Sequence, residues 1–158
     1  GAHCEFTGVT FAGKGQFLDT GSKVVHNAPH TTSNIDSKSL SKSGGVCIYR
    51  GAVIINEKAE GAKSNVSCES LMLDEISQSD TIPAIIVKND NIDLGHEAKI
   101  GRISDEAVYY LMSRGLSEEE ARAMLVRGFV EPVSKALPLE YAVEMNNLIN
   151  LELKGSLK

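Results

Sequence analysis

The sequence has little of several residue types that characterise common classes of protein. It contains no tryptophan, four prolines and three cysteines in 158 residues. The cysteines, Cys4, Cys47 and Cys68, are odd in number and irregularly spaced, which excludes a disulfide framework. A chain of this length buries enough apolar surface to fold without such cross-links. We therefore expect free thiols and a reducing compartment, the cytoplasm.

A long apolar run and an excess of positive charge are also missing. No segment approaches the roughly 20 apolar residues that a membrane-spanning helix needs. Lysine and arginine number 16 against 21 aspartates and glutamates, which gives a formal net charge of −5. Nucleic-acid binding is not expected, because there is no basic stripe to follow a phosphate backbone. We predict a soluble globular protein whose partners include neither membrane nor nucleic acid.

Common catalytic motifs are missing as well. The sequence has no Gly-x-Ser-x-Gly nucleophile elbow, no Walker A loop and no Gly-x-Gly-x-x-Gly run. We therefore do not expect an enzyme. The side chains that remain as candidates for chemistry are cysteine, histidine and glutamate, all of which can bind metals.

The sequence that is present changes in character near residue 103. Residues 1–103 hold short apolar, β-branched runs between Gly, Asn, Asp and Ser, a pattern typical of short strands. Successive runs begin at Val24, Val46, Val66 and Ile86, at intervals of 22, 20 and 20 residues, and a second series is interleaved with them. This repeat predicts a solenoid of the parallel β-helix type, with coils of about 20 residues and at least two strands per coil. A β-sandwich is the alternative, weakened by the absence of Asn-Gly and Asp-Gly hairpin turns.

Residues 104–158 have helical periodicity instead. Ser104 has the sequence context of a helix N-cap, because two acidic residues follow it. Ser117 and Glu120 have the spacing of a capping box. We therefore expect one helix to begin after each of these serines.

Two prolines divide the end of the chain. Pro132 and Pro138 are each expected in the first turn of a following helix. The last segment, Leu139 to about Leu153, is apolar on more than one face. Such a helix packs between two surfaces, which belong either to this chain alone or to this chain and a partner protein.

Three groups of potential metal ligands are present. His96-Glu97 follows a predicted strand, His26 and His30 lie in a loop, and Cys68 lies in an alternating segment that predicts a strand. None of these groups has the spacing of a zinc signature. Each is also compatible with a purely structural role, so the residues alone leave its function open.

Several separately placed motifs resemble those of one protein family. They are Ser37–Gly45, Tyr49–Gly51, Ser79–Pro83, Gly95–Ile103, Tyr109–Ala121 and Gly128–Pro132. Together they resemble the C-terminal region of the SufB/SufD family, the scaffold proteins of the SUF system for iron–sulfur cluster assembly. The SufB-type member has a cysteine in the position of Cys68 and a His-Glu pair in the position of His96-Glu97. The chain is therefore more similar to SufB than to SufD.

The resemblance implies a fold and a function. The fold is a right-handed parallel β-helix over residues 1–103, followed by a small helical domain over residues 104–158. The function is to hold a nascent, transient iron–sulfur cluster, with Cys68, His96 and Glu97 as its ligands. The helical domain would bind the SufC ATPase, and the second scaffold subunit would be a SufD-like paralogue or another copy of this chain.

The resemblance also implies that the site is shared between subunits. The 28 residues from Cys68 to His96 correspond to about one and a half coils of the predicted length, so the two side chains need not meet within one chain. Family members have a longer β-helix and a further N-terminal region. We therefore expect this chain to be a C-terminal fragment or an unusually short member.

Two other functions are compatible with the same patterns. One is a SufD-like interaction module that recruits the ATPase without binding a cluster. The other is a carbohydrate-active β-helix enzyme, which would need clustered carboxylates. The available carboxylates are Asp74, Glu75, Asp80, Asp90 and Asp93. Their scatter over predicted turns favours solvated corners instead.

Overall fold

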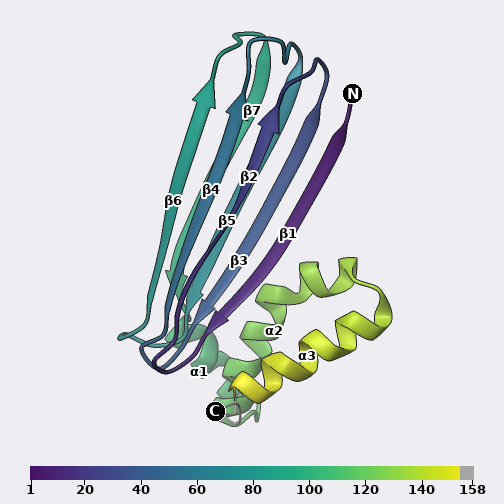
Figure 1. The fold of residues 1–158 in the computed structure, drawn as a ribbon. Helices are drawn as coiled ribbons and strands as arrows, with labels where there is room; N and C mark the ends of the chain where they lie inside the picture. The colour runs from purple at the N-terminus through teal and green to yellow at the C-terminus, as the bar shows by residue number, and fades with distance from the viewer. Residues whose placement is uncertain (154–158) are drawn as a thin grey trace.

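The computed structural model describes residues 1–153 and consists of seven strands followed by three helices (Figure 1). The strands are β1 (His3–Ala12), β2 (Phe17–His26), β3 (Thr32–Ser41), β4 (Val46–Ile55), β5 (Ala62–Met72), β6 (Gln78–Val87) and β7 (Ile92–Arg102). The helices are α1 (Asp105–Ser113), α2 (Glu118–Ala136) and α3 (Leu139–Leu153). Residues 154–158, the end of the predicted helical domain, lie outside the described residues.

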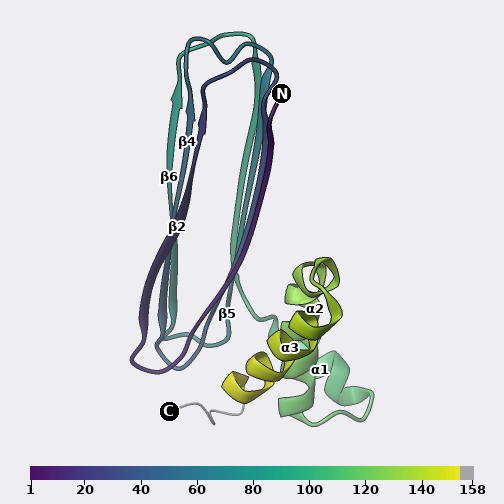
Figure 2. The same cartoon turned by 45° about the vertical axis from the view of Figure 1, so that its right-hand side comes forward.

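The strands form two parallel sheets that face each other. One has the strand order β1-β3-β5-β7 and the other the order β2-β4-β6, so each coil places one strand in each sheet (Figures 1 and 2). The prediction of a parallel β-solenoid followed by helices is confirmed. The β-sandwich alternative is wrong, because every pair of neighbouring strands is parallel.

The coil is longer than predicted. The register partners His3 and Thr32 are 29 residues apart, and the register partners Ser33 and Ser64 on the next coil are 31 residues apart. The predicted coil length is wrong, because the apolar runs used to define it begin in strands of both sheets. Each strand has ten or eleven residues, and an apolar run marks only part of it.

Alternate residues of each strand point into the solenoid. In β4, Cys47, Tyr49, Val53 and Ile55 are buried, whereas Arg50 is exposed. The inward residues of β3 and β5 pack against those of β4 in one apolar cluster. Burial of this inner surface is the main stabilising contribution to the coils.

Part of the interior is lined by hydroxyl groups instead. Ser33 hydrogen-bonds with Ser64 on the next coil (2.9 Å), and Ser39 does so with Ser70 (2.7 Å). Ser39 also reaches Ser79 of the opposite sheet (3.3 Å). These bonds satisfy polar groups that would otherwise be buried at a cost, and the bond between Ser39 and Ser79 joins the two sheets.

The helices begin as the local sequence predicts. The Ser104 side chain accepts a hydrogen bond from a backbone N–H of α1, and Ser117 forms a complete capping box with Glu120 at the start of α2. The prediction for Pro132 is wrong, because α2 continues through it to Ala136. Pro138 does immediately precede α3.

The helices pack on the outer face of the four-stranded sheet, near the end where β7 leads into α1 (Figure 2). Leu40 of β3 points outward and is completely buried against Val126 and Val130 of α2 and Ile149 of α3. Among the three helices described, none combines the length and the apolar character needed to span a membrane.

A buried lysine lies beneath α2 on the same outer face. Lys38 of β3 forms an ion pair with Glu69 of β5, its register partner. The lysine Nζ also lies 4.7 Å from the centre of the Phe129 ring of α2. This arrangement joins two strands and a helix through one charged group, which combines an ion pair with a cation–π contact.

Candidate functional site

Cys68 points into the solenoid from β5 and is only 2% exposed. Its register partners are Ser37 of β3 and Ala98 of β7. Burial raises the pKa of the Cys68 thiol, and the negative charge of Asp36 raises it further. The thiol is therefore protonated at neutral pH, and a metal that binds there must displace its proton.

His96 and Glu97 are exposed and lie on β7, the outermost strand of the four-stranded sheet. His96 pairs with the inward-pointing Val66, so its imidazole is on the inner face of the sheet. Glu97 is on the outer face, where its Oε1 lies 2.9 Å from the Nζ of Lys99. The two neighbours therefore point to opposite faces of the strand.

The relation between Cys68 and His96 also differs from the prediction. Because the coil is longer than predicted, the two residues lie on adjacent strands, and the expectation of one and a half coils is wrong. Cys68 pairs with Ala98, two positions from His96 and on the same inner face. Yet within residues 1–153 no three His, Cys, Asp or Glu side chains are close enough to hold a metal ion. The described chain thus aligns Cys68 and His96 but does not gather all three predicted ligands.

The other two cysteines have different surroundings. Cys47 is buried in β4 and its thiol lies 3.2 Å from the carbonyl oxygen of Leu40, to which it donates a hydrogen bond. Burial raises the pKa of Cys47. Cys4 is exposed on β1, an edge strand of the sheet in which Cys68 lies on the inner strand β5. We expect Cys47 to be a structural residue, since its thiol is already used as a donor.

His26 and His30 do not form a site together. His26 is buried, with Nδ1 2.8 Å from the Thr31 hydroxyl and Nε2 2.9 Å from the Ser33 hydroxyl. Burial lowers the pKa of His26, so the ring is neutral inside the solenoid. The ring of His30 instead packs against Gly61, where a Cβ atom would lie 2.5 Å from Nδ1.

The carboxylates that a carbohydrate-active enzyme would need are dispersed. Asp74 does lie at a corner, and hydrogen bonds from Ser77, Ser43 and Ile76 lower its pKa although burial acts in the opposite direction. The expectation of corner positions is wrong for Asp80 and Asp93, which lie within β6 and β7. This dispersion gives the carbohydrate-active alternative no support.

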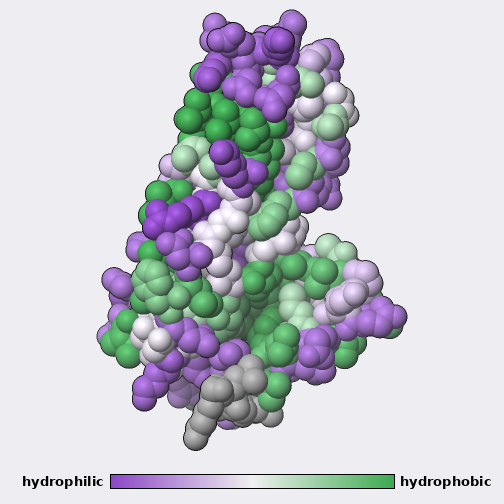
Figure 3. Space-filling model, in the orientation of Figure 1, coloured by the Kyte–Doolittle hydropathy of each residue, from purple (hydrophilic) through white to green (hydrophobic). Residues whose placement is uncertain are grey.

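The last coil is open on one side in the described chain. Ile85 and Val87 of β6 occupy inward positions, as does Ile100 of β7, but all three are exposed. Apolar residues also gather on the surface over the upper part of β4 and β6 (Figure 3). Exposed apolar residues beside the unpaired edge of a strand favour association with another chain.

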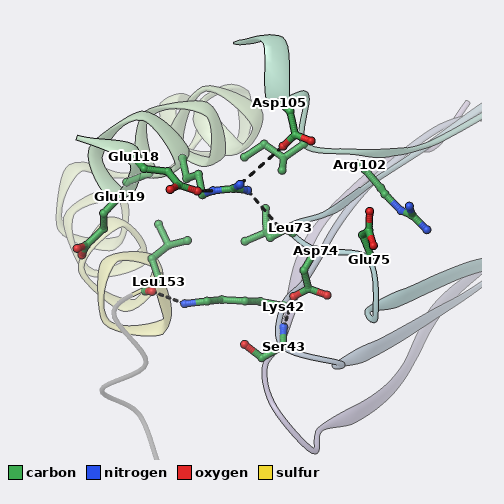
Figure 4. Close-up of a pocket in the computed structure, with 13 residues that line it drawn as sticks. Lys42, Ser43, Leu73, Asp74, Glu75, Arg102, Asp105, Glu118, Glu119 and Leu153 are labelled. Carbon is green, nitrogen blue, oxygen red and sulfur yellow. Dashed lines mark hydrogen bonds and ion pairs between the residues drawn. The ribbon is translucent and has the colours of Figure 1, made fainter. Parts of the chain in front are cut away.

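A hollow of about 850 Å³ separates the corners of the coils from the helices (Figure 4). Arg122 lines it, with Nε 2.9 Å from Oε1 of Glu118 and a longer contact to Asp105 at 3.7 Å. Lys42 donates a hydrogen bond to the carbonyl oxygen of Leu153. The Arg122 ion pairs lie within the helices, whereas the bond from Lys42 to Leu153 and a 3.4 Å hydrogen bond from Arg122 to the carbonyl oxygen of Leu73 connect the coils to the helices. These contacts indicate a structural role for this hollow.

Tyr49 lies near Cys68 and was not among the predicted site residues. Its ring is buried in the same cluster as Cys68, and its hydroxyl is 2.6 Å from the Ser22 hydroxyl. Burial raises the pKa of Tyr49, and the charge of a Cys68 thiolate raises it further. The alternation Cys47, Tyr49, Gly51 would have placed Tyr49 inside the solenoid. Its proximity to Cys68 depends on how two strands face each other, which the alternation does not reveal.

The fold and its candidate ligands define a β-solenoid protein with a buried thiol and an exposed imidazole near an open last coil. The family model described as "SUF system FeS cluster assembly, SufBD core domain" matches residues 1–129. The chain therefore belongs to the SufBD family of iron–sulfur cluster assembly proteins.

Named relatives agree with this assignment. The chain is 57% identical over 157 residues to an iron–sulfur cluster assembly SufBD family protein of Staphylococcus haemolyticus and to one of Staphylococcus epidermidis. It is 56% identical to one of Staphylococcus aureus strain USA300. In each comparison the match covers 99% of this chain and 34% of the relative. The chain thus spans about a third of the length of these curated relatives.

Proposed function

We propose that this chain holds a nascent iron–sulfur cluster on a SUF assembly scaffold, with Cys68, His96 and Glu97 as its ligands. The observation that carries the proposal is the position of these residues beside the open last coil. His96 lies on the outermost strand, and Cys68 lies on the strand next to it. A second subunit at this edge would add its own ligands to a shared site.

The ligand set suits cargo that must later be released. Thiolate is the preferred ligand of iron–sulfur clusters, and imidazole or carboxylate can complete a labile site. Cys68 binds iron only after losing its proton, and its raised pKa makes that loss harder. Glu97 must leave Lys99 to bind. Both requirements weaken retention, as a scaffold that transfers its cluster needs.

The second subunit is either another copy of this chain or a SufD-like paralogue. In both cases the partner would cover Ile85, Val87 and Ile100 on the open coil. The three free cysteines support a reducing compartment, and we place the protein in the cytoplasm. The role is assembly and not catalysis.

The helices provide a separate surface for the SufC-type ATPase. Tyr109, Tyr110, Leu139 and Tyr141 are all exposed large side chains on α1 and α3. Aromatic residues of this kind are enriched where proteins bind one another. Replacing Tyr109 and Tyr110 by serine is expected to weaken ATPase binding in a pull-down without changing the far-UV circular dichroism of the chain. Unchanged binding would show that the ATPase uses another surface.

Anaerobic reconstitution with iron and sulfide tests the cluster site. The parent protein is expected to develop visible absorption from a bound cluster, and Cys68→Ser is expected to lose it. Cys47→Ser is the matched control, because Cys47 is equally buried but already donates to Leu40. Retention by Cys68→Ser, or loss only in Cys47→Ser, would contradict the assignment. A parent that binds ATPase but no cluster would favour the SufD-like alternative.

A further inference from the structure

The hydroxyl of Thr81 is buried without a partner. Its Oγ1 atom is inaccessible to solvent and makes no hydrogen bond within residues 1–153. Buried hydroxyl groups in folded proteins are nearly always hydrogen-bonded, so an exception requires an explanation. A group that binds next to the hydroxyl during function is one such explanation.

Contacts between the sheets place Thr81 opposite Cys68. Ser79 of β6 hydrogen-bonds with Ser39 of β3, which in turn bonds with Ser70 of β5, so these three residues occupy one level of the solenoid. Thr81 is the next inward residue after Ser79. Cys68 is the inward residue immediately before Ser70. Because the two sheets run in opposite directions (Figure 1), both steps lead to the same adjacent level.

Two other hydroxyl groups lie at this level, those of Ser37, the register partner of Cys68, and of Tyr49. Tyr49 is the register partner of Thr81, and its phenol hydrogen-bonds with Ser22 at 2.6 Å. Thr81 has an O–H group that nothing in the described chain uses, and a sulfur ligand at Cys68 can accept a hydrogen bond from a neutral donor of this kind.

We infer that Thr81 is a positioning residue that donates a hydrogen bond to the anionic sulfur at Cys68. The inference rests on the proposed function, since it assigns Thr81 to the same site. Hydrogen bonds to sulfur ligands stabilise iron–sulfur clusters and tune their properties. A hydrogen bond to a cluster-bound sulfur would give the Thr81 hydroxyl the partner that it lacks within residues 1–153.

The substitution Thr81→Val tests this role because it removes the hydroxyl and keeps the shape of the side chain. Alkylation of Cys68 by iodoacetamide is measured at one pH by peptide mass spectrometry, which reads each cysteine separately. The thiolate is the reacting species. The rate at Cys68 is expected to fall by about tenfold, the effect of losing one hydrogen bond to a charged group. The rate at Cys47 is expected to stay unchanged.

A second buried orphan hydroxyl provides the matched control. Ser41 is completely buried and its Oγ also lacks a hydrogen-bond partner within the described chain. It lies four residues beyond Ser37, the register partner of Cys68. Neither Ser41→Ala nor Thr81→Val is expected to lower the midpoint of urea unfolding, because each removes an unsatisfied group. Only Thr81→Val is expected to slow the alkylation of Cys68. Thr81→Ser keeps the hydroxyl, so its Cys68 is expected to be alkylated at the parent rate.

Several results would overturn the inference. Alkylation of Cys68 at the parent rate in Thr81→Val would show that the hydroxyl does not act on the sulfur. Equal slowing in Ser41→Ala, or a lowered urea midpoint in Thr81→Val, would show a general structural effect. In reconstituted protein, Thr81→Val is expected to lose its cluster to a chelator faster than the parent. If the parent binds no cluster, the proposed function fails, while the alkylation rates still decide the role of Thr81.

Discussion

The ion pair between Lys38 and Glu69 beneath α2 leads to a prediction about the free energy of unfolding. Replacing one partner should destabilise the protein more than replacing the other. The Lys38 side chain is 7% exposed, whereas that of its partner Glu69 is 27% exposed. Replacing either one by methionine removes the same ion pair. The two variants differ in which charge is left behind and in how far that charge can regain water.

The magnitude follows from the exposure of the remaining charge. Removing one partner of a buried pair costs about 3–5 kcal/mol when the other charge stays buried. Glu69→Met leaves Lys38 enclosed by the sheet and Phe129, so we expect a loss in this range. Lys38→Met leaves Glu69 able to rehydrate, and with the lost cation–π contact we expect a loss of about 2 kcal/mol. The double variant is expected to recover most of the loss, because two methionines leave no unpaired charge.

Urea unfolding of the four proteins at one concentration measures these differences as a double-mutant cycle. The reasoning predicts that Glu69→Met is less stable than Lys38→Met and that the double variant is more stable than Glu69→Met. Equal losses for the single variants would show that the exposure of the remaining charge does not set the cost. Additive losses would show that the pair contributes little to holding α2 on the sheet.

Three further predictions concern stability. Burial lowers the pKa of His26 below its ordinary value of 6.5, so below that pH the unfolded chain binds more protons than the folded one and the stability of the fold should fall. His26→Gln should flatten this fall in the midpoint of urea unfolding, and an unchanged pH profile would contradict the prediction. Val126→Ala should cost about 2 kcal/mol by opening a cavity under α2, and a loss no larger than that of a surface variant would refute close packing there. Gly45→Ala should prevent folding, because its Cβ would lie 2.3 Å from the Ala12 carbonyl oxygen. Gly128→Ala, on an open helix surface, should instead raise the stability by about 0.5–1 kcal/mol. Thermal unfolding of both variants checks the contrast.

Local rules predicted the parts of the fold that depend on neighbouring residues. Ser104 and the Ser117–Glu120 pair cap helices because a capping side chain reaches only two or three residues along the chain. The short apolar runs likewise indicated strands. The predicted length of the coil was wrong, because the true length also depends on outward polar residues and corners that carry no periodic apolar signal.

The same error affected the candidate site. Alternation around Cys68 was enough to place it on one face of a strand, but its neighbours depend on the true coil length. Because the coil of the structure is longer than predicted, His96 lies on the strand next to that of Cys68. The roles of Thr81 and Lys38 could not be predicted, because they arise from contacts across the sheets and beneath a helix. Cluster binding itself remains a prediction.

The register of the coils also determines how such a chain can change in length over evolution. Deleting a single residue within a strand exchanges its inner and outer faces, and so exposes its apolar residues. Adding a whole coil preserves every face and places new strands between old ones. Cys68 on β5, His96 on β7 and the helices all belong to the last coils. Duplication of a coil nearer β1 would therefore lengthen the solenoid and leave these two residues and the helices beside one another. Natural variation in length should therefore occur in steps of one whole coil, the separation of paired strands.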